Sequence, residues 1–135
     1  MNEKILKALE NDRTIDIITT GAKTGLPRRV EIWFWNMDGR FIITGTPDAG
    51  KKRGTRTPRD WLANLKANPE FTFILKGSVD AELPAKALEI TDPEDRKALM
   101  SDPETKWYRD QGNSVDDLVE RSPIVEVFFE DYAKD

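Results

Sequence analysis

Short runs rich in β-branched and aromatic residues, each ended by a turn signal, constrain this fold more than any other feature. Residues 14–20 (TIDIITT) and 28–35 (RRVEIWFW) are two such runs, and a glycine-containing stretch lies between them. An Asp-Gly pair at 38–39 then precedes a third run at 40–46. Strand-sized runs joined by such turns are typical of antiparallel hairpins. The first half of the chain therefore predicts three consecutive antiparallel strands.

The second half repeats this pattern and adds helices. Strand-sized runs occupy 70–76, 79–90 and 124–130, and Pro84 favours an edge or a bulge in the second of them. Between the last two runs, three segments have the residues of a capped helix start. These segments are Thr91-Asp92-Pro93-Glu94, Ser101-Asp102-Pro103-Glu104 and Ser114-Val115-Asp116-Asp117. We expect a helical insertion before the closing strand.

Two further helices are predicted. Residues 1–13 alternate charged residues with apolar ones, as in an amphipathic helix. Residues 58–67 follow Thr57, which suits an N-cap, and carry Trp61 and Leu65 on one face. Six strands in a meander, one central helix and a late helical insert predict an α+β fold, a six-stranded antiparallel β-barrel with flanking helices. The length of 135 residues predicts one domain over 1–135.

The chain contains no histidine and no cysteine, which excludes several kinds of chemistry. Disulfides, thiolate nucleophiles, zinc fingers and the usual iron–sulfur clusters need cysteine. A Ser-His-Asp triad and a zinc site that needs imidazole are excluded as well. No metal-binding constellation is visible in the sequence. If the protein is an enzyme, a bound cofactor is expected to supply the reactive group.

Charge is distributed unevenly along the chain. The net charge is -4, yet residues 19–66 contain ten Lys or Arg and four Asp or Glu. This basic middle favours the binding of a small anion over that of a long polyanion, which needs a broad basic surface. Nucleic-acid binding is therefore disfavoured. The alternative is that the basic and acidic parts simply neutralise each other across the fold.

No segment has the length or composition of a signal peptide or a membrane anchor. The longest apolar runs, such as 32–35 and 71–75, are strand-sized and far below the roughly 20 residues that a membrane helix needs. The sequence therefore predicts a cytoplasmic location without a stable membrane anchor.

Residues 45–51 match the G-x-x-x-x-G-K spacing of a P-loop, but we reject that interpretation. Lys52 stands where magnesium binding needs a hydroxyl, and Gly54 and Pro58 prevent the helix that must follow at once. The same stretch is nevertheless strongly basic and leads into a helix start, whose free N–H groups also attract anions. Its cations are Lys51, Lys52, Arg53, Arg56 and Arg59.

The first turn is a second candidate for anion binding. Lys23, Thr24 and Arg28 place two cations and a hydroxyl around glycines, which let backbone N–H groups approach an oxyanion closely. Two such loops in one small barrel favour a phosphate or polycarboxylate ligand. The alternative is that each loop is a solvated basic turn.

The aromatic residues have mainly structural interpretations. Trp33, Phe34 and Trp35 alternate along a strand, so Phe34 points to the face opposite the two tryptophans. Core or dimer packing is expected from them. Trp61 could line a ring-binding site, although packing in the core is more typical of that position. Tyr108 is a candidate proton donor to a substrate, and a buried anchor for the helical insert is the more typical alternative.

Several of these segments resemble the deazaflavin-dependent nitroreductase family. The resemblance rests on residues 19–28 (TTGAKTGLPR), on the strand with Trp33 and Phe34, and on residues 61–69 (WLANLKANP). Residues 121–125 (RSPIV) resemble the closing strand of that family. The resemblance extends from about residue 15 to residue 130. It implies a split β-barrel related to the pyridoxamine-phosphate oxidase-like flavin proteins, and a homodimer.

The resemblance also implies a cofactor, a reaction and site residues. The cofactor is the deazaflavin F420, with FMN as the alternative. The reaction is hydride transfer to a small, hydrophobic, electron-poor acceptor such as a quinone or nitro compound. Lys23 and Arg28 match positions that hold the anionic part of the coenzyme, and Arg56 stands where another basic residue does so, whereas Asn64 has mainly a structural role. The full set of expected cofactor-binding residues is Lys23, Thr24, Arg28, Arg56, Thr57 and Trp61.

Two other functions stay open at this point. The same barrel is compatible with an FMN-binding oxidoreductase, or with a non-catalytic carrier of a flavin-like, tetrapyrrole or lipid ligand. Composition does not separate them. Binding of F420 and FMN, followed by turnover of a quinone, distinguishes the three possibilities.

Overall fold

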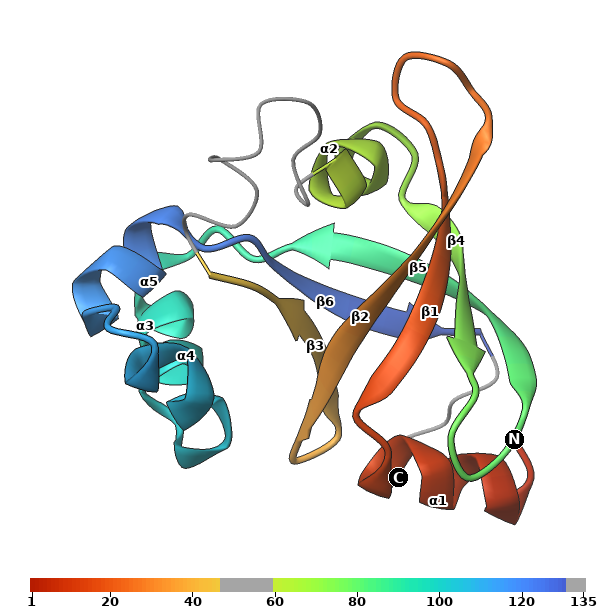
Figure 1. Ribbon diagram of the computed structural model, residues 1–135, viewed down its shortest axis with the longest axis horizontal. Coiled ribbons are helices and arrows are strands. Elements are labelled where there is room, and N and C mark those ends of the chain that lie inside the picture. Colours follow the sequence, from red (N-terminus) through yellow and green to blue (C-terminus); the bar gives the residue numbers. More distant parts are fainter. Residues whose placement is uncertain (47–59, 131–135) are drawn as a thin grey trace.

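The six strands of the barrel pair in an order that differs from their order in the chain. In the computed structural model, which describes residues 1–46 and 60–130, the antiparallel strands close in the order β1-β2-β3-β6-β5-β4 (Figure 1). These strands are β1 (Thr14–Thr20), β2 (Pro27–Met37), β3 (Arg40–Thr44), β4 (Glu70–Leu75), β5 (Ala81–Glu89) and β6 (Ile124–Phe129). The predicted α+β barrel is thus confirmed.

The prediction of a single meander is wrong. β3 pairs with β6, with Thr44 opposite Ile124, and β4 pairs with β1, with Thr72 opposite Ile18. The barrel therefore consists of two three-stranded meanders joined along two seams. The reason lies in α2 (Asp60–Ala67), which stands between β3 and β4 in the chain. A helix between two strands removes the tight connection that would make them neighbours.

The helices begin largely where the capping residues predicted. The remaining helices are α1 (Glu3–Asn11), α3 (Pro93–Ser101), the 3₁₀ turn η1 (Pro103–Thr105), α4 (Lys106–Asp110) and α5 (Val115–Arg121). The side chain of Asp92 accepts a hydrogen bond from the Asp95 amide at 3.2 Å, and Ser114 accepts one from the Asp117 amide at 3.1 Å. The predicted start of α2 at Thr57 lies outside the described residues. Within the described part of the chain, no helix is long and apolar enough to cross a membrane.

Pro84 occupies the kind of position that the sequence predicted. It lies on β5 opposite Thr72 of β4, whereas the pairing of β5 with β6 begins only at Ala85. Among the described residues, Pro84 therefore lies where β5 has one strand neighbour, and its missing N–H group interrupts no second ladder there.

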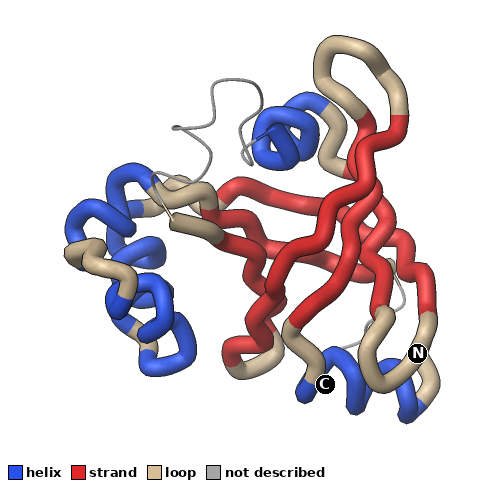
Figure 2. The backbone as a smooth tube through the Cα atoms, in the orientation of Figure 1, coloured by secondary structure: helices blue, strands red, loops and turns tan. Residues whose placement is uncertain are grey.

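The main core fills the barrel and continues into the helices at its two ends. The Phe73 ring packs edge-on against Phe34 and Phe129, at centroid distances of 5.2 and 5.0 Å. Leu9 of α1 and Leu65 of α2 belong to the same buried cluster. Figure 2 shows these two helices at opposite ends of the strands. The ends of the barrel are thus closed by amphipathic helices, which bury apolar surface that the strands alone would expose.

A second core lies outside the barrel, beneath the helical insert α3–α5. Trp35 and Ile42 project outward from neighbouring strands and pack with Tyr108 and Leu118. Phe34, between Trp33 and Trp35, belongs to the inner core instead. The predicted alternation of these three aromatic residues is confirmed, and it explains why both faces of this part of β2 are apolar.

Candidate functional site

The β1–β2 hairpin carries two of the cations singled out in the sequence. Its turn is closed by a hydrogen bond from the Gly21 amide to the Leu26 carbonyl at 2.8 Å, and Gly25 has a positive φ of 70°. The Thr24 hydroxyl accepts a hydrogen bond from the Leu26 amide at 3.2 Å. A Cβ atom on Gly21 would lie 2.5 Å from the Thr24 hydroxyl oxygen. Thr24 and the glycines therefore shape the turn that presents Lys23.

Arg28 and Arg29 are adjacent but lie in different environments. Arg29 pairs with Asp16 at 2.8 Å, and the same carboxylate also pairs with Lys76. The hydrogen bond from Lys76 is the main cause that holds the pKa of Asp16 below its usual range, and the bond from Arg29 adds to it. Arg28 is half-buried, and among the residues that the structure describes neither Arg28 nor Lys23 has an ion pair or a side-chain hydrogen bond. The two hairpin cations that the sequence predicted are thus available to an anion.

Helix α2 packs against the base of this hairpin through Asn64. The Asn64 side chain accepts a hydrogen bond from the Ala22 amide at 2.9 Å and donates one to the Thr19 hydroxyl at 3.1 Å. Thr19 is the cross-strand neighbour of Arg28. Asn64 is buried with both ends of its amide bonded. The structural role expected of Asn64 is therefore observed, and it brings α2 next to the strand position of Arg28.

The part of β2 that follows the hairpin has a described strand partner on one side. Residues 27–33 of β2 pair with β1, but pairing with β3 begins at Phe34. Within the described part of the chain, the other edge of this segment has no strand neighbour. An unpaired strand edge presents backbone N–H and C=O groups that can bind a ligand. On its inward face this segment carries Arg28, followed by Val30 and Ile32, which are half-buried against the main core.

The candidate site is therefore defined by the hairpin turn, the open edge of β2 and the adjoining surface of α2. Counting only partners among the described residues, it combines two cations without an ion pair, backbone groups of β2 without a strand neighbour, and an apolar wall formed by Val30 and Ile32. Sequence reasoning found the cations but missed the open edge and this wall. The alternation RRVEI in residues 28–32 is the signal that could have indicated the wall.

Of the remaining predicted site residues, the structure describes Trp61 but neither Arg56 nor Thr57. Trp61 is 6% exposed and packs in the main core with Leu65. The core packing that the sequence favoured for Trp61 is therefore observed. The predicted site residues Arg56 and Thr57 lie outside the described residues.

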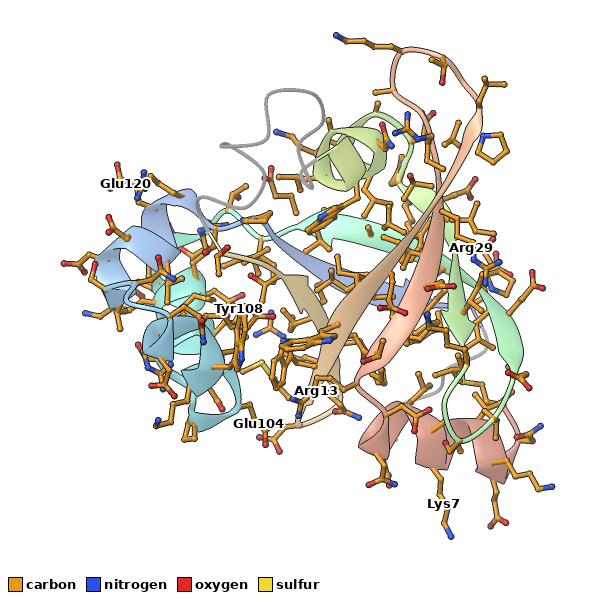
Figure 3. The ribbon with its side chains drawn as sticks, in the orientation of Figure 1. Lys7, Arg13, Arg29, Glu104, Tyr108 and Glu120 are labelled. Atoms are coloured by element: carbon orange, nitrogen blue, oxygen red, sulfur yellow. The ribbon has the colours of Figure 1, made fainter. Side chains whose placement is uncertain are left out.

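Tyr108 is held between the insert and the barrel. Its hydroxyl accepts a hydrogen bond from the Trp35 indole at 3.0 Å and lies 3.4 Å from the Thr44 carbonyl oxygen, to which it can donate. Burial raises the pKa of Tyr108, and the Trp35 bond and the charge of Arg13 oppose this only in part. Figure 3 shows Tyr108 on the side of the insert, away from Arg29 on the β1–β2 side. Its contacts are those of an anchor.

The insert is further fixed by two arginines that sequence reasoning did not single out. Arg40 of β3 donates paired hydrogen bonds to Asp95 at 2.9 Å each and also bonds to Glu126 of β6. Arg96 is buried and donates to the carbonyls of Ile90 at 2.7 Å and Ser122 at 2.5 Å. These contacts join α3 to the barrel. No local sequence signal indicates them, because every partner is distant in the chain or is a backbone group.

The described residues contain no group of three or more carboxylates placed to hold a metal ion. What they offer is the capture of an anion beside an apolar surface. Such an arrangement can bind and orient a cofactor or substrate with a charged end and a flat apolar part.

This chain is similar to one protein family and to several solved structures. The family model described as F420H(2)-dependent quinone reductase matches residues 2–120. A conserved hypothetical protein from Mycobacterium tuberculosis superposes with a TM-score of 0.65 at 20% identity, covering 96% of this chain and 81% of that one. A putative pyridoxamine 5'-phosphate oxidase from Listeria innocua gives 0.61 at 14% identity, covering 95% and 92%. A structure described as an F420-H2 dependent reductase gives 0.51 at 21% identity, covering 87% and 95%. These three solved structures show the shared fold.

Proposed function

The chain belongs to the F420H(2)-dependent quinone reductase family, and on this premise we propose that it transfers a hydride from reduced F420 to a small hydrophobic quinone. Membership makes it an oxidoreductase with F420 as its cofactor. The identity of the acceptor and the residues that bind the coenzyme are our proposal. The observation that supports it is that Lys23 in the hairpin turn and Arg28 at the start of the open segment of β2 have no ion-pair partner among the described residues.

The described residues fit the anionic part of such a coenzyme. Lys23 is exposed at the turn and Arg28 is half-buried at its base, and neither is neutralised by another described side chain. A guanidinium and an ammonium suit phosphate and carboxylate groups, and charge-assisted hydrogen bonds are the strongest of their kind. Arg29, by contrast, is already used by Asp16. We therefore propose that Lys23 and Arg28 bind the charged end of F420.

The apolar part of the site suits a flat ring. Val30 and Ile32 form its wall beside the core. The backbone groups of β2 that have no strand partner in the described part of the chain supply hydrogen bonds in the plane of the strand. When bound in reduced form, F420 supplies the hydride, so that the protein needs neither a histidine nor a cysteine for the transfer. The residues of the chain bind the charged end, orient the ring and keep water from one of its faces.

The proposal is tested by titrating the purified protein with F420 and FMN side by side, followed by turnover of a soluble naphthoquinone with the reduced coenzyme. We expect tighter binding of F420 and quinone-dependent oxidation of its reduced form. Binding without turnover would favour a carrier, and preferential binding of FMN would favour the flavin alternative.

The site residues are tested with neighbouring variants. Lys23→Ala and Arg28→Ala should each weaken F420 binding by about 1–3 kcal/mol, because each loses a charge-assisted contact. Arg29→Ala is the matched control, since it removes the adjacent arginine, which is bound to Asp16, and should leave the affinity unchanged. Equal affinities in all three variants would reject the proposed site.

A further inference from the structure

The outer surface of β5 and β6 exposes two large apolar side chains next to each other. Leu88 is 63% exposed and Phe128 is 48% exposed. In the strand register Leu88 lies opposite Glu126 and Lys86 lies opposite Phe128. Leu88 and Phe128 are therefore diagonal neighbours on one face, about 7–8 Å apart. A single exposed apolar residue is ordinary, whereas this pair adjoins on one strand surface and makes that surface a candidate contact area.

These four residues form a rectangle with a particular symmetry. One diagonal is apolar, with Leu88 and Phe128, and the other carries opposite charges, with Lys86 and Glu126. A two-fold axis along the apolar diagonal places Leu88 against Leu88 of the second copy, and Phe128 against Phe128 of the second copy. The same rotation places each Lys86 opposite the partner's Glu126. The surface is thus complementary to itself, which is the requirement for the interface of a two-fold dimer.

The charges on this face agree with such pairing. Lys86 has no ion pair with any residue that the structure describes. Glu126 binds Arg40, which also binds Asp95, so this ion cluster carries one negative charge in excess. A carboxylate has more acceptor positions than the contacts with Arg40 use. The partner's Lys86 would neutralise the cluster.

The packing geometry is also acceptable. With strands about 4.8 Å apart and residues about 3.4 Å apart along each strand, the diagonal runs about 35° from the strand direction. The strands of the two copies then cross at about 70°, near the orthogonal class of sheet packing. A hollow of about 470 Å³ is lined in part by Lys86 and Leu88, and one of about 260 Å³ in part by Glu126 and Phe128. Figure 1 shows β5 and β6 side by side in the part of the barrel between α2 and α1.

From these observations we infer that a second copy of this chain binds on the outer face of β5 and β6, with Leu88 and Phe128 on the two-fold axis. The inference is independent of the coenzyme, because the face contains neither Lys23 nor Arg28. It names the interface that the sequence could not locate.

Single-cysteine variants test the geometry directly, because the natural chain has no cysteine. We expect Leu88→Cys and Phe128→Cys to form a covalent dimer on mild oxidation at low protein concentration, since each residue faces its own copy. Leu26→Cys is the matched control, because Leu26 is 62% exposed on the hairpin and should remain largely monomeric under the same conditions. Equal cross-linking of all three variants would overturn the inference.

Sedimentation of the chain without cysteine gives a second measurement. We expect a dimer whose dissociation constant rises at least about ten-fold in Lys86→Glu, which places two carboxylates opposite each other. Leu26→Ser should leave that constant unchanged. A monomeric wild type throughout the micromolar range, or a dimer insensitive to Lys86→Glu, would overturn the inference, whatever the F420 titration shows.

Discussion

Removal of one buried hydroxyl measures how strongly the helical insert is fixed to the barrel. Tyr108 is 3% exposed, and its hydroxyl accepts the indole hydrogen of buried Trp35 at 3.0 Å. In Tyr108→Phe the ring remains, with its edge contacts to Trp35 and Trp107. The loss is therefore confined to hydrogen bonding.

The size of the expected destabilisation follows from the Trp35 indole N–H group, which loses its acceptor in Tyr108→Phe. An indole N–H that is buried without an acceptor costs about 1–3 kcal/mol. The second contact, to the Thr44 carbonyl, is long at 3.4 Å and adds little. We expect Tyr108→Phe to lower the free energy of unfolding by about 2 kcal/mol.

Urea unfolding followed by tryptophan fluorescence measures this change. The midpoint should fall while the slope stays constant, since the native fold is retained. Trp35→Phe and the double variant complete a cycle whose coupling energy isolates the bond between the two side chains. A coupling energy near zero would refute the reasoning.

The same variant separates the two interpretations of Tyr108. If Tyr108 is an anchor, turnover at a temperature where the variant is folded should stay close to that of the wild type. A large loss of turnover without a loss of stability would instead identify Tyr108 as a proton donor to the acceptor.

Two further predictions concern charged groups. The pKa of Asp16 is lowered mainly by the hydrogen bond from Lys76. The stability that the ionised Asp16 contributes is therefore fully present above the ordinary carboxyl pKa near 4. It is lost as the pH falls through the lowered pKa of the folded state. Asp16→Asn should therefore be less stable than the wild type at neutral pH and should lack this acid-linked loss, as measured by urea unfolding at a series of pH values; parallel pH profiles would contradict the prediction. Arg96→Met removes a guanidinium that donates to three backbone carbonyls and should lower the free energy of unfolding by about 3 kcal/mol or more. A change in the urea midpoint no larger than that of Lys97→Met, on an exposed neighbouring residue, would show that those bonds are dispensable.

The turns and helix caps that were predicted correctly from the sequence depend on contacts between residues close together in the chain. Asp38 and Gly39 have φ values of 54° and 86°, which is the conformation expected of an Asp-Gly hairpin turn. Asp92 and Ser114 cap their helices through amides only three residues away. Both partners of such a contact lie within a few residues of each other, so a short sequence motif contains both of them.

The order of the strands in the barrel and the second core could not be predicted from short sequence motifs. The pairing of Thr44 with Ile124 joins residues separated by more than half of the chain. The alternation around Phe34 predicts two faces but does not tell which one lies inside the barrel. Only the position of the helical insert, which covers Trp35 and leaves Phe34 to the inner core, settles that question.

The candidate site also depends on contacts between residues that are distant in the sequence. Arg28 and Arg29 are identical in type and adjacent in sequence, and no local rule separates them. Alternation along β2 turns them to opposite faces, and Asp16 on the neighbouring strand then neutralises one and leaves the other. Whether a cation is free to bind a ligand is thus a property of its cross-strand partners and not of its motif. If Arg29→Ala weakened F420 binding as much as Arg28→Ala, the total charge of the hairpin, and not the placement of a single guanidinium, would govern coenzyme binding.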